Sequence, residues 1–368
     1  MPEQSGAELR QAENVRDSRI AGIVPLLAPD ALLEQLPLSG ENAEVVIRGR
    51  RDVQGILDGA DDRLLVVVGP CSVHDPDATL EYAAKLGILA GRLSSDLLIA
   101  MRVYFEKPRT TTGWKGLIND PHLDGSGDVN GGLHLARHVL LGVLETGLPV
   151  GCEFLDPITP QYIADAVSWG AIGARTTESQ IHRQLGSGLS MPVGFKNRTD
   201  GNVQVAVDAV RAAAVSHVFA GIAPSGRPAV LQTSGNADCH IILRGGKGRP
   251  NYDSASVAAA LELLEAARLP TRVMIDLSHD NSGKDPQRQP GVAAEVGEQI
   301  ATGNDAIVGV MLESFLIAGR QDLRPGAELR YGQSITDGCI GWETTTEVLD
   351  GLAASVRGRR SARADEAS

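Results

Sequence analysis

Six basic residues of this chain follow short apolar segments, in a protein whose formal charge is −12. They are Arg102, Lys107, Arg109, Arg175, Lys196 and Arg244. Basic side chains gathered in one place attract anionic ligands, and the guanidinium group of arginine matches phosphate or carboxylate oxygens in pairs. If these residues converge, they predict ligands with more than one anionic group, such as two phosphates and a carboxylate.

A second set of residues after apolar segments carries sulfur, nitrogen and oxygen donors. Cys71, His279 and Glu313 belong to this set, and Asp280 and Asp337 are acidic residues nearby. Thiolate, imidazole and carboxylate donors together suit a divalent transition metal. Their wide spacing in the sequence gives a metal site no support of its own, and Cys71 taken alone is typical of a core thiol.

Eight apolar segments precede these residues and are expected to form parallel strands that are buried on both faces. Most intervals between them show helical patterns, so the alternation predicts an α/β fold, a (β/α)8 TIM barrel, in which strand ends converge on one active face. A doubly wound sheet is the alternative, but GPCSVHDP after the first segment is not its glycine-rich turn. The segments are residues 64–72, 97–105, 148–155, 171–175, 191–197, 239–246, 272–280 and 306–314.

Two further segments are not needed for a minimal barrel of eight strands and eight helices. Residues 1–63 are expected to form an N-terminal arm with helices, and residues 217–232 a β-hairpin that turns at Pro224-Ser225-Gly226. Both are candidate interface or regulatory additions, and they imply a homo-oligomer, a dimer or a tetramer. The catalytic barrel is expected over residues 64–352, and residues 353–368 are expected to be a flexible tail.

Composition excludes several other classes of protein. Aromatic residues make up only 4% of an acidic chain, which argues against binding to nucleic acid. No apolar segment is long enough to span a membrane. The four cysteines form no CxxC pair, and the first residues lack the apolar core of an export signal, so a cytoplasmic protein is expected.

Eight longer motifs resemble the class I, microbial type of 3-deoxy-D-arabino-heptulosonate-7-phosphate (DAHP) synthase, from about Arg16 to Gly351. The run KPRTT (107–111) separates this family from the related octulosonate synthases. The motifs are GPCSVHDP (69–76), MRVYFEKPRTTTGWKGLINDPHLD (101–124), EFLDPITPQY (153–162), WGAIGARTTESQ (169–180), PVGFKN (192–197), HIILRGGK (240–247), IDLSHDNSGK (275–284) and SITDGCIGWE (334–343).

The resemblance implies a metal-dependent condensation of phosphoenolpyruvate with D-erythrose 4-phosphate, which gives DAHP and phosphate in the first step of the shikimate pathway. One divalent metal ion, Mn, Fe, Co or Zn, is expected on Cys71, His279, Glu313 and Asp337. The resemblance assigns phosphoenolpyruvate to Arg102, Lys107, Arg175, Lys196 and Arg244, and the aldose phosphate to Arg109 and Thr110.

Catalytic roles are expected for Lys107, Cys71, His279, Glu153 and Lys196. The last two are assigned to positioning the water that attacks C2 of the enol and to moving its proton. A structural role for Glu153, as the ion-pair partner of one of the cations, is the alternative.

The same resemblance implies an aromatic amino acid effector. Pro157 and Gly221, together with the hairpin sequence, resemble the tyrosine-sensitive type, so weak feedback inhibition by tyrosine is the hypothesis. The expected effector residues are Pro157, Gln161, Ser190, Phe219 and Gly221.

Two other functions stay open at this point. One is the same chemistry on a different aldose phosphate in a specialised-metabolite pathway, which the intact Arg109 and Thr110 disfavour. The other is a non-catalytic regulatory paralogue, which the intact metal ligands disfavour.

Overall fold

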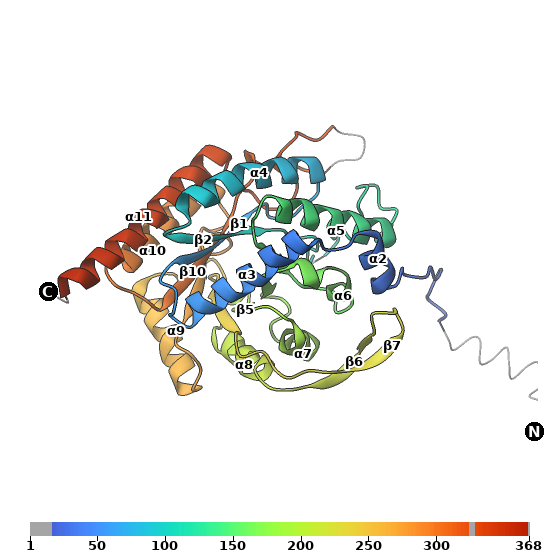
Figure 1. Cartoon of the computed structure of the whole chain (residues 1–368), viewed down its shortest axis with the longest axis horizontal. Helices are drawn as coiled ribbons and strands as arrows, with labels where there is room; N and C mark the ends of the chain where they lie inside the picture. The colour runs from blue at the N-terminus through green and yellow to red at the C-terminus, as the bar shows by residue number, and fades with distance from the viewer. Residues whose placement is uncertain (1–16, 110, 324–327, 367–368) are drawn as a thin grey trace, which may run out of the picture.

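Eight parallel strands close into a barrel in the computed structural model, which describes residues 17–109, 111–323 and 328–366 (Figure 1). The order around the barrel is β1-β10-β9-β8-β5-β4-β3-β2. This confirms the predicted (β/α)8 fold. The strands are β1 (Leu64–Gly69), β2 (Leu97–Arg102), β3 (Val150–Glu153), β4 (Trp169–Ile172), β5 (Val193–Lys196), β8 (His240–Leu243), β9 (Val273–Asp276) and β10 (Ile307–Glu313).

Every position of these eight strands is buried, which explains why they form continuous apolar segments in the sequence. The fourth segment was placed slightly too late, because β4 begins at Trp169 and ends at Ile172. Arg175 therefore lies in the turn after β4 rather than at its last position.

Helices cover the outside of the barrel (Figure 1). None of the described helices combines the length and apolar character needed to cross a membrane. The helices are α2 (Pro29–Gln35), α3 (Gly40–Leu57), α4 (Pro76–Leu93), α5 (Val129–Glu145), α6 (Pro160–Ile163), η1 (Ala164–Ala166), α7 (Gln180–Gly188), α8 (Gln204–Ala213), α9 (Ser254–Ala266), η2 (Pro286–Arg288), α10 (Gln289–Ala301) and α11 (Trp342–Glu366).

Alternate strand positions contribute to two apolar clusters. Leu65 and Met311 belong to the cluster inside the barrel, whereas Leu64 belongs to the larger cluster between strands and helices. Val53 and Ile56 of α3 join the inner cluster, so α3 closes the end of the barrel where the strands begin. The opposite end, where the strands finish, is left open to ligands.

The predicted hairpin is present as the antiparallel strands β6 (Val218–Ile222) and β7 (Pro228–Gln232). It extends away from the barrel on the side that carries α2 (Figure 1). The backbone N–H of Asp30 in α2 donates to the carbonyl of Pro224 at the hairpin turn, at 2.9 Å. The hydroxyl of Tyr162 in α6 donates to the carbonyl of Leu27, at 2.6 Å. The arm, the hairpin and α6 therefore contact one another in a single chain.

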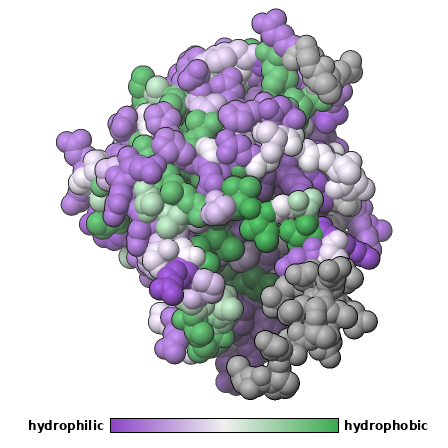
Figure 2. All heavy atoms as spheres, turned by 90° about the vertical axis from the view of Figure 1, so that its right-hand side faces the viewer, coloured by the Kyte–Doolittle hydropathy of each residue, from purple (hydrophilic) through white to green (hydrophobic). Residues whose placement is uncertain are grey.

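This side of the molecule also exposes apolar side chains, some of which are visible in the surface that Figure 2 shows. Ile23 and Val24 of the arm are at least 80% exposed, and Val218 and Val230 of the hairpin are more than 60% exposed. Grouped exposed apolar residues are typical of protein–protein contact surfaces. Two short strands outside the barrel, β11 (Ile317–Arg320) and β12 (Gln333–Ser334), complete the described elements.

The C-terminal segment differs from the expected flexible tail, because α11 continues without interruption to Glu366. Ala353 and Val356 are fully buried. Arg357 and Arg360 form ion pairs with the buried carboxylate of Asp96, which precedes β2. The polar sequence of this segment gave no sign of these distant partners, and the expectation was wrong for residues 353–366.

We predict that truncation after Leu352 lowers the free energy of unfolding by at least about 3 kcal/mol, because it exposes apolar surface of α10 and leaves Asp96 buried without partners. Chemical denaturation of the two chains measures the difference. Truncation after Arg363 keeps Val356, Arg357 and Arg360, and should retain wild-type stability. Equal stability of the shorter chain would contradict the structural role of this segment.

Candidate active site

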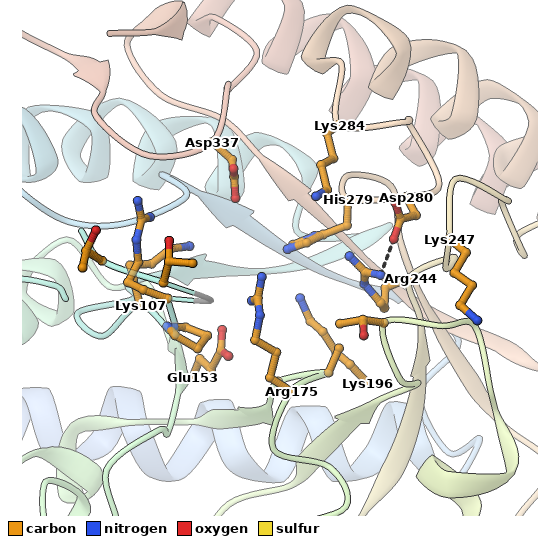
Figure 3. Close-up of a pocket in the computed structure, with 17 residues that line it drawn as sticks. Lys107, Glu153, Arg175, Lys196, Arg244, Lys247, His279, Asp280, Lys284 and Asp337 are labelled. Atoms are coloured by element: carbon orange, nitrogen blue, oxygen red, sulfur yellow. Dashed lines mark hydrogen bonds and ion pairs between the residues drawn. The ribbon is translucent and has the colours of Figure 1, made fainter. Parts of the chain in front are cut away.

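A polar cavity of about 720 Å³ lies where the strands end (Figure 3). Among the described residues, basic side chains dominate its lining, which suits ligands with several anionic groups. The basic residues are Lys107, Arg109, Arg175, Lys196, Arg244, Lys247 and Lys284, and the acidic ones are Glu153, Asp280 and Asp337.

Most residues that the sequence predicted for the site do reach this cavity. Lys107, Arg109, Glu153, Arg175, Lys196, Arg244, His279 and Asp337 line it. Cys71, Arg102 and Glu313 are buried beneath it. Thr110 lies outside the described residues.

Three of the four expected metal ligands come together. One donor atom each from Cys71, Glu313 and Asp337 lies within 4.8 Å of the other two. Cys71 follows β1 and Glu313 ends β10, and the paired positions Gly69 and Glu313 bring these two strand ends side by side. One sulfur and two carboxylate donors at this separation fit a divalent transition metal.

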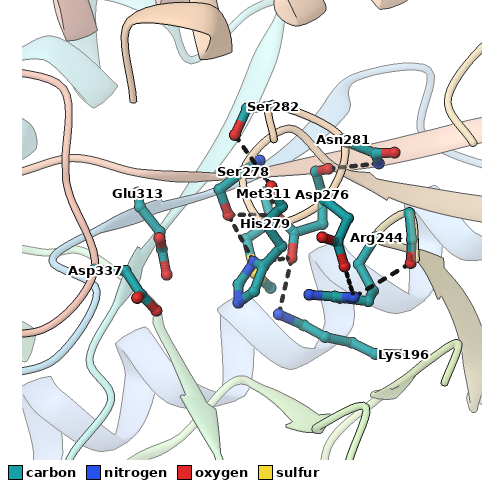
Figure 4. Close-up of polar contacts among 12 residues, drawn as sticks. Lys196, Arg244, Asp276, Ser278, His279, Asn281, Ser282, Met311, Glu313 and Asp337 are labelled. Atoms are coloured by element: carbon teal, nitrogen blue, oxygen red, sulfur yellow. Dashed lines mark hydrogen bonds and ion pairs between the residues drawn. The ribbon is translucent and has the colours of Figure 1, made fainter. Parts of the chain in front are cut away.

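His279 is not part of that group of three. Its Nδ1 lies 2.8 Å from Asp276 Oδ2 and 2.8 Å from Ser278 Oγ. Figure 4 shows the ring between this pair and the carboxylates of Glu313 and Asp337. A proton on Nδ1 that is donated to Asp276 leaves the Nε2 lone pair available to a ligand, as in metal sites where a carboxylate orients the histidine.

Two cations neutralise the donor group from one side. Lys107 Nζ donates to Cys71 Sγ at 3.0 Å, and Arg102 donates to Glu313 Oε1 at 3.0 Å. Arg102 also stacks on the ring of Tyr104, 3.7 Å from its centroid. Burial and then the charge of Glu313 raise the pKa of the Cys71 thiol to about 11, and Lys107 opposes this rise. A thiolate ligand at neutral pH therefore needs further positive charge at this position.

The buried carboxylate of Asp276, at the end of β9, connects the metal-ligand side to the basic side. Its Oδ2 accepts from Lys196 Nζ at 2.9 Å and faces His279 Nδ1, and its Oδ1 accepts from the hydroxyl of Ser278 at 2.6 Å. Burial by itself would raise the pKa of Asp276, but His279 and Lys196 outweigh it and hold the pKa well below its usual range. Asp276 therefore stays ionised and fixes both neighbours.

Arg175, Lys196 and Arg244 point into the same part of the cavity (Figure 3). Arg244 forms an ion pair with Asp280, and its backbone N–H donates to Asn197 Oδ1 at 2.8 Å. Three cations that come from β5 and from the turns after β4 and β8 can surround one phosphate group.

Glu153 is the last residue of β3, and its carboxylate lies against Gly173 in the turn that follows β4. A Cβ atom at position 173 would stand only 2.2 Å from Glu153 Oε1, so a larger residue there would displace the carboxylate from this position. Within the described part of the chain, no cation forms an ion pair with Glu153. This observation favours a role in proton transfer over the structural alternative.

Sequence reasoning missed Asp276, Lys247 and Lys284. Asp276 was hidden inside an apolar segment, although an acid in a strand buried on both faces was itself a signal. The two lysines lie in the loops after β8 and β9, where both have positive φ angles of 49° and 62°. Each ends a motif of the family resemblance, HIILRGGK (240–247) and IDLSHDNSGK (275–284), but neither was assigned a role.

The expected effector residues lie away from the cavity. Pro157 lies just before α6 and Gln161 lies within it. Ser190 follows α7, and Phe219 and Gly221 are on β6. These elements occupy the same side of the molecule as the arm (Figure 1).

Comparisons with known proteins agree with this geometry. The chain is 57% identical to the Phe-sensitive phospho-2-dehydro-3-deoxyheptonate aldolase of Escherichia coli K12, over 94% of this chain and 98% of that protein. It is 55% identical to a phospho-2-dehydro-3-deoxyheptonate aldolase of Corynebacterium glutamicum, over 97% of this chain and 99% of that protein. It is 52% identical to the Tyr-sensitive enzyme of Escherichia coli K12, over 92% of this chain and 95% of that protein.

A solved structure of phospho-2-dehydro-3-deoxyheptonate aldolase from Francisella tularensis superposes with a TM-score of 0.91 at 50% identity, over 92% of this chain and 99% of that one. The family model described as the DAHP synthetase I family matches residues 39–350. Since that match spans most of the barrel and all of the residues that build the cavity, the chain belongs to the DAHP synthetase I family.

Proposed function

We propose that this protein condenses phosphoenolpyruvate with D-erythrose 4-phosphate to give DAHP and inorganic phosphate, the first step of the shikimate pathway. The observation that carries the proposal is one cavity that places a ring of cations beside the Cys71, Glu313 and Asp337 donor group. Two phosphorylated reactants would repel each other in water, and the cations offset that repulsion and hold both in reach of one another.

The donor group would hold one divalent ion, with His279 as a fourth ligand through Nε2. When such an ion is bound, the site gains a Lewis acid for the aldehyde oxygen of the aldose phosphate. The mixed donors accept Mn, Fe, Co or Zn.

The cations divide between the two reactants. Arg175, Lys196 and Arg244 bind the phosphate of phosphoenolpyruvate, while Arg102 and Lys107 bind on its carboxylate side. Arg109 binds the phosphate of the aldose. This arrangement aims C3 of phosphoenolpyruvate at the aldehyde carbon, and the new carbon–carbon bond leaves positive charge at C2.

A water molecule then adds to C2; Lys196 and Glu153 position it, and the Glu153 carboxylate takes its proton. Asp276 keeps Lys196 in place for this step. The bond between C2 and the phosphate oxygen of the resulting hemiketal phosphate then breaks, and C2 becomes the ketone carbon of DAHP. Inorganic phosphate leaves between Arg175, Lys196 and Arg244. The same three cations stabilise its charge as it departs.

We expect the purified protein to consume phosphoenolpyruvate only when erythrose 4-phosphate is present, to stop when a chelator is added, and to recover with Mn²⁺. The loss of the enol absorbance measures the consumption of phosphoenolpyruvate, and the release of phosphate measures the formation of product. Other aldose phosphates should react at least about tenfold more slowly, because a poorly placed phosphate loses its contact with Arg109. Equal rates would favour the alternative aldose.

Cys71→Ala should lose bound metal and turnover together, since it removes the sulfur donor. Cys239→Ala is the matched control, because Cys239 is also a buried thiol but precedes β8 at the far end of the barrel. Full metal content and activity in Cys71→Ala would remove Cys71 from the ligand set.

Glu153→Gln should lower kcat about 100-fold and leave KM for both substrates within a few-fold, because the amide fills the same space but cannot take a proton. Steady-state kinetics on the metal-loaded protein measures the change. Glu178→Gln, an exposed glutamate that pairs with Arg198, is the control and should keep wild-type kcat. An unchanged kcat in Glu153→Gln would return Glu153 to a structural role.

We further propose a homo-oligomer in which the arm and the hairpin contact a neighbouring subunit and bind an aromatic amino acid. The exposed apolar residues of both segments and the contact between Asp30 and Pro224 support this proposal. The glycine at 221 and the proline at 157 support tyrosine as the effector.

We predict partial inhibition by tyrosine and weaker inhibition by phenylalanine and tryptophan in the same kinetic assay. Phe219→Ala should abolish the inhibition with unchanged kcat, because no residue of β6 lines the catalytic cavity. Strongest inhibition by phenylalanine would contradict the assignment.

A further inference from the structure

Glu106 is a buried acid that the mechanism above does not use. It immediately precedes Lys107 in the segment that brings Lys107 and Arg109 into the cavity, but it does not line the cavity itself. Only 3% of the residue is exposed. Its carboxylate contacts the segment that follows β3.

Three donors of that segment, residues 155–159, point at the Glu106 carboxylate. The backbone N–H groups of Leu155 and Asp156 donate at 3.4 Å and 3.3 Å. The hydroxyl of Thr159 donates at 3.1 Å. Because this segment begins two residues after Glu153, the carboxylate connects two walls of the cavity, one basic and one acidic.

The segment before Arg109 has few other fixed points on this side. Lys107 N–H donates to the carbonyl of Lys115, 2.8 Å away, which closes the loop on itself. Gly116 packs against the carbonyl of Phe105 so closely that a Cβ atom would stand 1.9 Å from it. These contacts keep the loop compact. Further back, the backbone N–H of Val103 donates to the carbonyl of Gly151 in β3 at 2.8 Å. Glu106 adds a link closer to Lys107 and Arg109, because its carboxylate contacts the residues that follow β3.

Stability does not explain a carboxylate at this position. Among the described residues no cation pairs with Glu106, and burial and then the nearby charge of Asp156 raise its pKa to about 7. Since the pKa of Glu106 in the folded state lies above its pKa in the unfolded chain, the folded state loses stability as the pH rises from the lower of these two values to the higher. A glutamine would remove the buried charge, but its NH2 group would face a backbone donor, whereas the carboxylate accepts on both of its oxygens.

We propose that Glu106 is a positioning residue that ties residues 107–109 to residues 155–159 and thereby sets the separation of Lys107 and Arg109 from Glu153 across the cavity. This inference deepens the proposed function and rests on it. It assigns to Glu106 no contact with either substrate.

The test compares Glu106→Gln, Thr159→Val and the double variant with the wild type, as metal-loaded full-length protein, in steady-state kinetics with both substrates. Glu106→Gln should lower kcat/KM for erythrose 4-phosphate by about tenfold to a hundredfold, with a clear rise in KM, because the cations move relative to Glu153. Thr159→Val should cause a smaller loss in the same direction. The double variant should be no worse than Glu106→Gln, since both changes remove one network.

A purely structural role predicts a different pattern, in which the thermal midpoint falls and KM stays constant. We expect the midpoint of Glu106→Gln at pH 8 to stay within about 3 °C of the wild type or to rise. Asp96→Asn is the matched control, because Asp96 is a buried carboxylate that pairs with Arg357 and Arg360 away from the cavity. It should lower the midpoint and leave KM unchanged.

Wild-type KM and kcat in Glu106→Gln would overturn this inference and leave the proposed function intact. A wild-type protein without turnover on phosphoenolpyruvate and erythrose 4-phosphate would overturn both.

Discussion

Repulsion between like charges is the constraint on which this site depends, because a chain of net charge −12 brings its cations together in one cavity. Buried carboxylates offset that repulsion from below. Asp276 pairs with Lys196, Glu313 with Arg102, and Asp280 with Arg244 at the cavity edge. Arg109, Arg175, Lys247 and Lys284 have no such ion pair among the described residues. The site therefore has a lower layer of paired, fixed cations and an upper layer whose charge is open to ligands.

This layering explains how one cavity serves two kinds of chemistry. The paired cations are buried and hold their positions, which suits groups that must stay fixed while bonds form and break. The unpaired cations are more exposed, which suits the capture of charged reactants from solution. Asp276 serves both the basic side and the metal-ligand side of the cavity, because the same oxygen that fixes Lys196 also faces His279. A change at Asp276 would therefore affect both halves of the site.

The sequence predicted the barrel and most of its site because both follow from burial. Parallel strands that are covered on both faces are mostly apolar, so a charged residue at the end of such a strand is conspicuous. Arg102, Glu153, Lys196 and Glu313 were found in this way. The family resemblance implied a role for Thr110, which lies outside the described residues, and named Asp337 as a metal ligand, where the strand ends alone gave it only as a nearby acid.

The remaining features depend on partners far apart in the sequence. Arg357 and Arg360 looked like the residues of a frayed tail, because Asp96 is more than 250 positions away. Asp276 lies within an apolar segment, and only the fold places Lys196 and His279 beside it. Glu106 has its partners about 50 positions along the chain, and only the fold brings residues 155–159 against it.

The seam of the barrel has one further consequence. The first strand, β1, pairs with the last, β10, and the donors of Cys71 and Glu313 stand on either side of that seam. During synthesis on the ribosome, β1 emerges more than two hundred residues before β10, so the ring stays open until nearly the whole chain has been made. An ion bound by these donors would join the two ends of the ring, and its binding free energy would be added to that of closure. Metal binding and closure of the barrel would therefore stabilise each other.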